Sequence, residues 1–395
     1  MTTHDTPQGG IPGTISLSLG LPDPATLLTA PLRDAMQGFL CSPYAAQALQ
    51  YGREQGVQEL IELLVARINR EQGLSLAASN LMIVAGSTQA VDMLARLYAK
   101  PGGTVLVEAP TYADALHLFR DHGLNLVALP MDEDGLIPNA LEEQLVKLRL
   151  KGIAPSLLYT IPTFHNPTGR TLPQARRLAI GELAHRYGFL IVEDDVYHDL
   201  SFGERVPCSF FALMQGQGVM TIGSFSKTLA PGLRLGWLTA SPAVIERCIN
   251  CGTTQMGGGA NPFVAHMVAH YLQRGAYDHH LHSLRILYQQ RRDSALAALS
   301  RFMPASVTWT LPAGGFFLWL TLPDQVFAAR ITQHAREQGI LVASGEGFFA
   351  TPSHGAHHLR LAYSCAAPKE IEQGVRGLAQ LIDQELDDVR ERDAE

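Results

Sequence analysis

Apolar and polar positions along the chain follow two spacings, which together predict a repeating series of helices and strands. Helical spacing runs over residues 56–73, 89–100 and 113–123. Continuous apolar runs of strand length, some followed by a turn, lie at residues 81–89, 104–112, 124–131, 157–162, 189–195 and 219–227. Parallel strands that are covered on both faces have this continuous apolar character. The pattern predicts an α/β fold with a mostly parallel central sheet flanked by helices.

The pattern changes towards the C-terminus. From about residue 285 it becomes a long helix, then short strands, then two further helices. This change predicts a smaller α+β domain that the N-terminal segment completes. We therefore place a large domain at residues 46–284, and a small domain at residues 1–45 together with residues 285–395.

Composition and charge narrow the class of protein. The chain of 395 residues is 46% hydrophobic and 17% charged, which is ordinary for a globular protein. Its net charge of −7, without a long basic run, argues against a nucleic-acid partner. The leader MTTHDTPQGG lacks the layout of a signal peptide, and no apolar run approaches the ~18–20 residues of a membrane span. Five cysteines are too few for a disulfide framework, so we expect a cytoplasmic protein.

A lysine just past a predicted buried strand is the first candidate for chemistry. The segment GSFSKTLAPGLRLGW places Lys227 close in sequence to Ser224, Ser226 and Arg234. Burial and neighbouring cations lower the pKa of a lysine and free its amine to attack an aldehyde. Two hydroxyls and an arginine suit a phosphate dianion. A surface turn with an incidental lysine explains the same residues equally well.

Three other segments lie where a predicted strand ends or a helix begins. FLIVEDDVY ends an apolar strand in acids, Asp194 and Asp195, which could hold a pyridinium nitrogen or cap a helix. Ser87 and Thr88 could bind phosphate at a helix N-terminus or only cap that helix. Asn166 begins an NPTG turn that could present its amide to a ligand. Taken singly, the capping interpretations are the simpler ones.

Along the chain the four segments follow one another as the Ser87 turn, the NPTG turn, the EDDVY segment and the SFSK segment. In this order they resemble the fold-type I aminotransferases of class I/II, which use pyridoxal 5′-phosphate (PLP). The resemblance is closest to the 2-aminoadipate, kynurenine and aromatic aminotransferase group. It covers nearly the whole chain and includes SLGLPDP (18–24), LQYGREQG (49–56), EAPTY (108–112), PAGGFFLW (312–319), GEGFF (345–349) and LRLAYS (359–364). It implies a PLP cofactor, a homodimer with shared active sites, and ping-pong transfer of an amino group from an L-amino acid to a 2-oxo acid.

The resemblance also implies roles for the catalytic residues. Lys227 would form a Schiff base with the cofactor and shuttle the proton between the substrate and the cofactor. Asp194 would hold the pyridine nitrogen, and it is preferred over Asp195 because it stands three residues before Tyr197. Tyr197 and Asn166 would hydrogen-bond the phenolic oxygen of the cofactor.

The remaining roles concern the ring, the phosphate and the substrate. Tyr112 would stack on the cofactor ring. Arg360 would pair bidentately with the substrate α-carboxylate, with Gly20 and Asn166 beside it. The phosphate would be bound by Ser87, Thr88, Ser224, Ser226, Arg234 and, from a second subunit, Tyr51.

The substrate side chain is less well determined by these motifs. Leu27, Leu28 and His165 are candidates for the wall of its pocket. The apolar Leu27 and Leu28 suggest a neutral, bulky side chain, and the resemblance implies a broad specificity or aromatic or 2-aminoadipate-like substrates. Metal chemistry is not expected, because Cys248 and Cys251 have no second cysteine pair for zinc.

Two alternatives to amino transfer share the same residues. A PLP-dependent lyase or decarboxylase of this fold would also carry Lys227, Asp194 and Arg360. A PLP-sensing regulator would need an N-terminal helix-turn-helix domain, and the aminotransferase pattern already begins by residue 18, which leaves no room for one.

Overall fold

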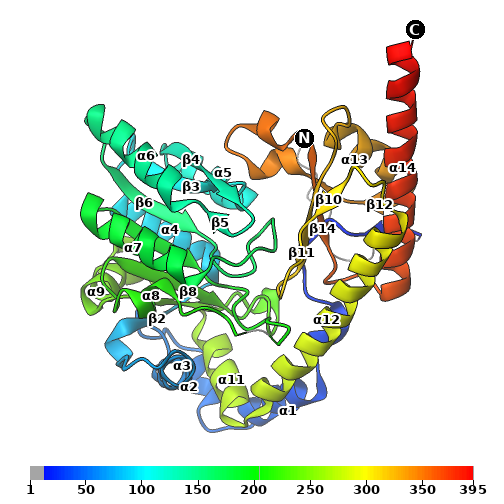
Figure 1. Ribbon diagram of the computed structural model, residues 1–395. Helices are drawn as coiled ribbons and strands as arrows, with labels where there is room; N and C mark the ends of the chain where they lie inside the picture. The colour runs from blue at the N-terminus through cyan, green and yellow to red at the C-terminus, as the bar shows by residue number, and fades with distance from the viewer. Residues whose placement is uncertain (1–12, 204, 395) are drawn as a thin grey trace.

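The computed structural model describes residues 13–203 and 205–394, and its strands form two main sheets of different kinds (Figure 1). The polar leader and the first part of the predicted small domain lie outside these residues. The larger sheet contains β2 (Leu81–Val84), β3 (Thr104–Ala109), β4 (Asn125–Asp132), β5 (Gly135–Leu136), β6 (Pro155–Thr160), β7 (Leu190–Asp194), β8 (Val219–Ser224) and β9 (Gly236–Thr239).

The larger sheet is mostly parallel, as the apolar runs predict. Its order is β2-β9-β8-β7-β6-β3-β4-β5, and the five strands from β8 to β4 run parallel to one another. Strand β9 is antiparallel to both β2 and β8, and β5 is antiparallel to β4. The carboxyl ends of β3, β6, β7 and β8 therefore meet at one edge, where ligands gather in sheets of this kind.

Helices cover both faces of the larger sheet. They are α3 (Gln58–Gln72), α4 (Ser87–Tyr98), α5 (Ala113–Asp121), α6 (Pro138–Leu150), α7 (Gln174–Tyr187), α8 (Phe210–Leu213), α9 (Pro242–Ile249), α10 (Gly252–Gln255) and α11 (Pro262–Gln273). Along β3, Val105 and Val107 pack with α4 and α5, whereas Leu106 packs with α6 and α7. Alternate side chains of a strand point to opposite faces, so a continuous apolar run fills two cores at once.

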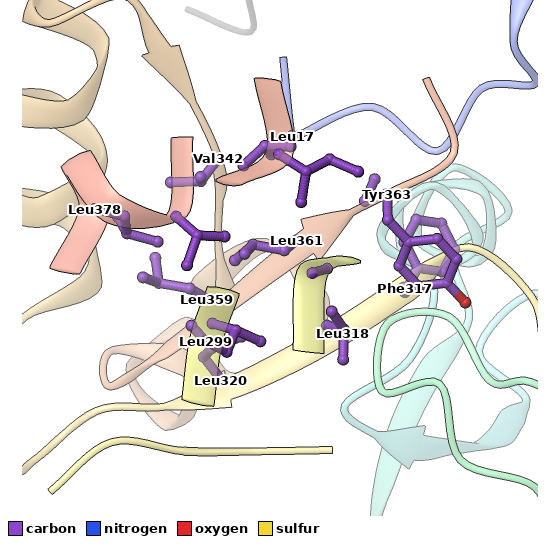
Figure 2. Packing of buried hydrophobic residues seen from close by; sticks show 14 of the residues in the cluster. Leu17, Leu299, Phe317, Leu318, Leu320, Val342, Leu359, Leu361, Tyr363 and Leu378 are labelled. Atoms are coloured by element: carbon purple, nitrogen blue, oxygen red, sulfur yellow. The ribbon is translucent and has the colours of Figure 1, made fainter. Parts of the chain in front are cut away.

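The smaller sheet is antiparallel, in the order β10 (Thr308–Trp309), β11 (Phe317–Thr321), β14 (His358–Ala362) and β13 (Ala343–Ser344). Beside it, β1 (Ile15–Ser16) pairs in parallel with β12 (Ile340–Leu341), so chain segments from both ends of the sequence meet here. The sheet packs with α12 (Ala276–Phe302), α13 (Ala328–Glu337) and α14 (Pro368–Ala394). Figure 2 shows this core, in which Leu17 lies near Leu361 and Tyr363.

Helix α12 runs from the helices beneath the larger sheet to the smaller sheet (Figure 1). Near its start lies α1 (Ala30–Leu40), whose buried Leu32, Ala35 and Phe39 pack in one core with α3 and α11, just before α2 (Ala45–Ala48). The domain boundaries at residues 45/46 and 284/285 stay predictions. Among the described residues, no helix is long and apolar enough to cross a membrane.

Candidate active site

Lys227 lies in the turn that directly follows β8, at the edge where the parallel strands end. Its side chain is half-buried, and its Nζ donates a hydrogen bond to the carbonyl oxygen of Gly20 at 3.3 Å. The Nζ lies 5.9 Å from the ring centroid of Tyr197. Burial, with a contribution from Arg360, lowers the pKa of Lys227 to about 8, although Asp194 opposes the change. An amine with this pKa is partly unprotonated near neutral pH and can act as a nucleophile.

Asp194 is the last residue of the neighbouring strand β7 and is buried. The hydroxyl of Tyr159 donates to its Oδ2 at 2.6 Å, whereas its Oδ1 is buried and has no partner among the described residues. Burial raises the pKa of Asp194 to about 6, although the hydrogen bond from Tyr159 lowers this pKa in part. Because a turn and not a helix follows, Asp194 caps no helix. The free Oδ1 can accept a hydrogen bond from a ligand.

Tyr197 and Asn166 lie between these residues and the smaller sheet. The buried ring of Tyr197 packs edge-on against Phe316 and Phe317, with centroids 5.6 and 5.7 Å away. Burial raises the pKa of Tyr197 above its usual value, so its hydroxyl stays protonated. Asn166 is buried too, and its Oδ1 accepts a hydrogen bond from Arg360 Nη1 at 2.9 Å.

Arg360 brings a buried positive charge from strand β14 into the same region. Its Nη1 donates to Asn166 and its Nη2 to the carbonyl oxygen of Ser18 at 2.6 Å, while its Nε is buried without a partner. The guanidinium lies over the rings of Phe317 and Phe348, 4.4 and 4.6 Å from their centroids. Burial lowers the pKa of Arg360 to about 10, which still leaves it charged at neutral pH.

Among the described residues, the hydrogen bonds of Arg360 go to two neutral oxygens, those of Asn166 and Ser18, and not to a carboxylate. A buried charge is costly unless an opposite charge pairs with it. The site is therefore suited to an anionic ligand with two oxygens, because a guanidinium can donate to both.

The start of α4 forms a second place for an anion. Gly86 is its N-cap residue at φ 85, and no side chain caps the helix, although Ser87 and Thr88 follow. The capping interpretation of these hydroxyls is therefore wrong, and they are free for other contacts. A Cβ atom on Gly86 would lie 2.6 Å from Nη2 of Arg234, so the guanidinium sits against the helix N-terminus. Backbone N–H groups, hydroxyls and a guanidinium together suit a phosphate.

Two other residues predicted to bind the phosphate, Ser224 and Arg234, adjoin this helix start, since Ser224 pairs with Gly236, which packs against Gly86. Ser224 ends β8, and its Oγ accepts a hydrogen bond from the backbone N–H of Ser226 at 3.0 Å. Arg234 has left-handed backbone geometry, with φ 47, which is uncommon for a residue with a side chain. This geometry holds its guanidinium against Gly86.

The two remaining tyrosines predicted to contact the cofactor differ in how far they are buried. Tyr112 precedes α5 and is half-buried, and its hydroxyl donates to Oδ2 of Asp114 at 2.5 Å. Tyr51 is 88% exposed and lines a groove of about 1030 Å³ to which Ala85 and Arg234 also contribute. The contact of Tyr51 with the phosphate of a second subunit stays a prediction.

Several contacts of the site have no signal in the sequence. Tyr159 belongs to an apolar strand and gives no sign that it holds Asp194. Phe317 packs so closely against Gly20 that a Cβ atom there would lie 2.3 Å from its ring. His165, a candidate for the pocket wall, is instead buried between Thr168, at 2.9 Å, and Glu108, at 3.2 Å. It stabilises its own turn, whereas Leu28 is 57% exposed.

The chain matches a family model and is similar in sequence and structure to several known proteins. The family model described as "Aminotransferase class I and II" matches residues 19–378. The chain is 35% identical to aromatic-amino-acid aminotransferase 1 of Thermococcus litoralis, covering 94% of this chain and 88% of that protein. It is similar to the structure of Pyrococcus horikoshii kynurenine aminotransferase in complex with PMP, KYN and KYA, with a TM-score of 0.90, 36% identity, and 95% and 92% of the two chains covered.

A third similar structure is the α-aminoadipate aminotransferase of Thermus thermophilus, complexed with N-(5′-phosphopyridoxyl)-L-leucine. Its TM-score is 0.85 at 32% identity, with 95% of this chain and 93% of that chain covered.

Proposed function

Because this chain belongs to the class I and class II aminotransferases, we propose that it moves the amino group of an L-amino acid to a 2-oxo acid at the site around Lys227. The chain is a transaminase, and its fold is that of the PLP-dependent transferases. What we propose are the contacts of the cofactor, the substrate class, the dimer and the role of each residue. The buried, unpaired guanidinium of Arg360 beside the amine of Lys227 carries the proposal, because α-amino acids share the carboxylate that it needs.

The residues fit PLP at four separate points. The Oδ1 atom of Asp194 would accept a hydrogen bond from the protonated ring nitrogen, which gives this buried atom a partner. The start of α4, with Arg234, would bind the phosphate dianion. When bound, PLP supplies an aldehyde that takes up the amino group and a cationic ring that accepts electrons. Tyr197 and Asn166 would hold the phenolic oxygen, and Tyr112 would cover the ring.

The protein residues have two tasks in the reaction. Arg360 and Asn166 orient the substrate by its α-carboxylate, which places the Cα–H near the amine of Lys227. Lys227, with its lowered pKa of about 8, can take a proton from Cα and return it as a general base and acid. The aromatic rings of Phe317 and Phe348 beside Arg360 exclude water and strengthen its pairing with the carboxylate.

For the substrate side chain we propose neutral bulky, aromatic or 2-aminoadipate-like amino acids. The similar proteins are named for aromatic amino acids, kynurenine and α-aminoadipate, and one was solved with a leucine adduct. In this chain the apolar Leu28 is exposed close in sequence to Gly20, where an apolar side chain could contact it.

We also propose a cytoplasmic homodimer. Tyr44, Leu49, Tyr51 and Met256 expose large apolar side chains in one chain, and three of them line the groove that Arg234 shares. A second subunit that covers them would bring its own Tyr51 to the phosphate. Sedimentation of the holoenzyme at twice the monomer mass would support the dimer, and a stable monomer with full activity would contradict it.

The five cysteines are all unpaired, which supports a reducing compartment such as the cytoplasm.

A spectral titration with amino acids tests the function. Purified protein reconstituted with PLP should absorb in the visible range, and productive amino acids should bleach this band with release of their 2-oxo acids. A second 2-oxo acid should then restore the band in equal stoichiometry. Twenty amino acids together with 2-aminoadipate and kynurenine would rank the substrates. Release of ammonia without return of the band would contradict transamination and favour the lyase alternative.

Replacing Asp194 tests the contact with the ring nitrogen. We expect Asp194→Asn to lower kcat by about 10- to 100-fold, because a charged hydrogen bond contributes roughly 1.5–3 kcal/mol. Tyr159→Phe removes only the hydroxyl that holds Asp194, and we expect a loss of kcat of about fivefold. Steady-state kinetics at saturating substrate measure both. Wild-type kcat in Asp194→Asn would show that this carboxylate does not serve the reaction.

A further inference from the structure

Directly beside Asp194 stands a second buried carboxylate, which faces away from the proposed cofactor site. Asp195 follows the last residue of β7, and its backbone N–H continues the ladder to Ile222 at 3.0 Å. Successive side chains of a strand point to opposite faces. Accordingly, Asp194 meets Tyr159, whereas Asp195 lines a cavity of about 60 Å³ behind the sheet. This cavity is large enough for ordered water.

Asp195 forms an ion pair with His198, which follows it in the next turn. The distance between Asp195 Oδ2 and His198 Nδ1 is 2.8 Å, and the backbone N–H of His198 donates to the carbonyl oxygen of Asp195 at 3.2 Å. Burial alone would lower the pKa of His198, but Asp195, with Asp199 and Glu71, raises it to about 9. Burial would likewise raise the pKa of Asp195, yet His198 and then Arg177 lower it. At neutral pH both partners are charged.

The other charged groups around His198 are paired with arginines. Arg67 contacts Glu71 at 2.9 Å and Asp199 at 3.1 Å. On the other side of Asp195, the buried Arg177 lies 3.7 Å from Glu193. A groove of about 780 Å³ adjoins the cavity, and its remaining titratable groups are Arg205, Cys208, His282 and Arg285. Among the described residues, His198 is the ion-pair partner of Asp195. His198 also lines the groove, which gives it access to solvent.

We propose that His198 is a positioning residue for amino transfer: its imidazolium neutralises Asp195, so that the cofactor site carries the negative charge of Asp194 without that of Asp195. The inference rests on the proposed function. Two adjacent carboxylates each favour protonation of the other, and Asp195 does oppose ionisation of Asp194. A cation bound to Asp195 removes this opposition without touching the cofactor.

The proposal predicts the direction of a change in the holoenzyme. The protonated ring nitrogen would hold Asp194 ionised in the holoenzyme. Loss of the His198 charge then leaves the charge of Asp195 uncompensated, which makes the site more negative and favours the protonated form of the linkage between Lys227 and the cofactor. The pH midpoint of the visible absorption band should therefore rise in His198→Gln, by about one pH unit for a unit charge at this range. In the double variant His198→Gln/Asp195→Asn, both charges are absent and the midpoint should return close to that of the wild type.

Absorption titrations of four holoenzymes test this: the wild type, His198→Gln, the double variant, and His282→Gln. His282 lines the outer groove and is the matched control, for which we expect an unchanged midpoint. A wild-type midpoint in His198→Gln would overturn the inference, as would an equal shift in His282→Gln. If the wild type gives no visible band with PLP, the proposed function itself fails, which is a different result.

A second measurement needs no cofactor. In the apoprotein, the His198 imidazole should titrate near the expected pH of about 9 in NMR spectra, and Asp195→Asn should lower this midpoint. A midpoint near 6.5, the ordinary value for histidine, would overturn the ion pair and with it the inference. Thermal unfolding of each variant shows whether the fold is kept.

Discussion

Lys227→Ala is expected to lower kcat for amino transfer by about 10⁴-fold, the upper end of what a positioned general acid–base contributes. The variant loses both the amine that attacks the cofactor aldehyde and the group that moves the Cα proton. No other lysine can take over, because the chain has only four more and all four are exposed at the surface. Single-turnover kinetics with a productive amino acid measure the loss.

The control for this variant is Lys147→Ala. Lys147 is an exposed lysine of α6, and we expect its removal to leave kcat within about twofold. The Lys227→Ala protein should still bind PLP noncovalently through the phosphate site, and its absorption should resemble that of free PLP. Activity within tenfold of the wild type in Lys227→Ala would rule out the assigned role.

Arg360→Ala is expected to lower kcat/KM by about 10³-fold, because loss of one partner from a buried charge pair costs roughly 2–5 kcal/mol. Arg360→Lys keeps the charge but cannot donate to two carboxylate oxygens in one plane, so we expect a loss of about 10²-fold. The loss should be similar for all amino-acid substrates, since they share the α-carboxylate. Steady-state kinetics with three productive amino acids measure it.

Two comparisons separate carboxylate binding from damage to the fold. A primary amine without an α-carboxylate should react at nearly the same low rate in the wild type and in Arg360→Ala. Arg330→Ala removes an arginine that pairs with Glu385 at 2.9 Å elsewhere in the small domain, and it should leave kcat/KM nearly unchanged. An equal loss for the amine and for amino acids in Arg360→Ala would contradict the assignment.

The sequence predicted much of the large sheet because local patterns specify its elements. The helical spacing over residues 56–73 stops where α3 ends, at Gly73, whose φ of 66 suits a residue without a side chain. The apolar runs gave the positions of β3, β6, β7 and β8, whose ends carry the candidate residues. The long helix begins at Ala276, earlier than the predicted change near residue 285, because the boundary of a helix depends on what it packs against.

Contacts between distant segments were beyond prediction from one sequence. Strand β9 inserts antiparallel between β2 and β8, although its four residues resemble those of the parallel strands. The bond from Arg360 to Ser18 joins residues 342 positions apart, and only the packing of the small domain brings them together. Likewise, nothing in the EDDVY segment reveals that Tyr159 binds Asp194 or that Asp195 turns to His198.

The central claim is that Lys227 binds PLP covalently, and chemical trapping tests it most directly. The PLP-loaded protein is reduced with borohydride, digested, and mapped by mass spectrometry. We predict one phosphopyridoxyl group per chain, on the peptide that contains Lys227, although five lysines are available. No label, or a label on another lysine with Lys227 unmodified, would contradict the account.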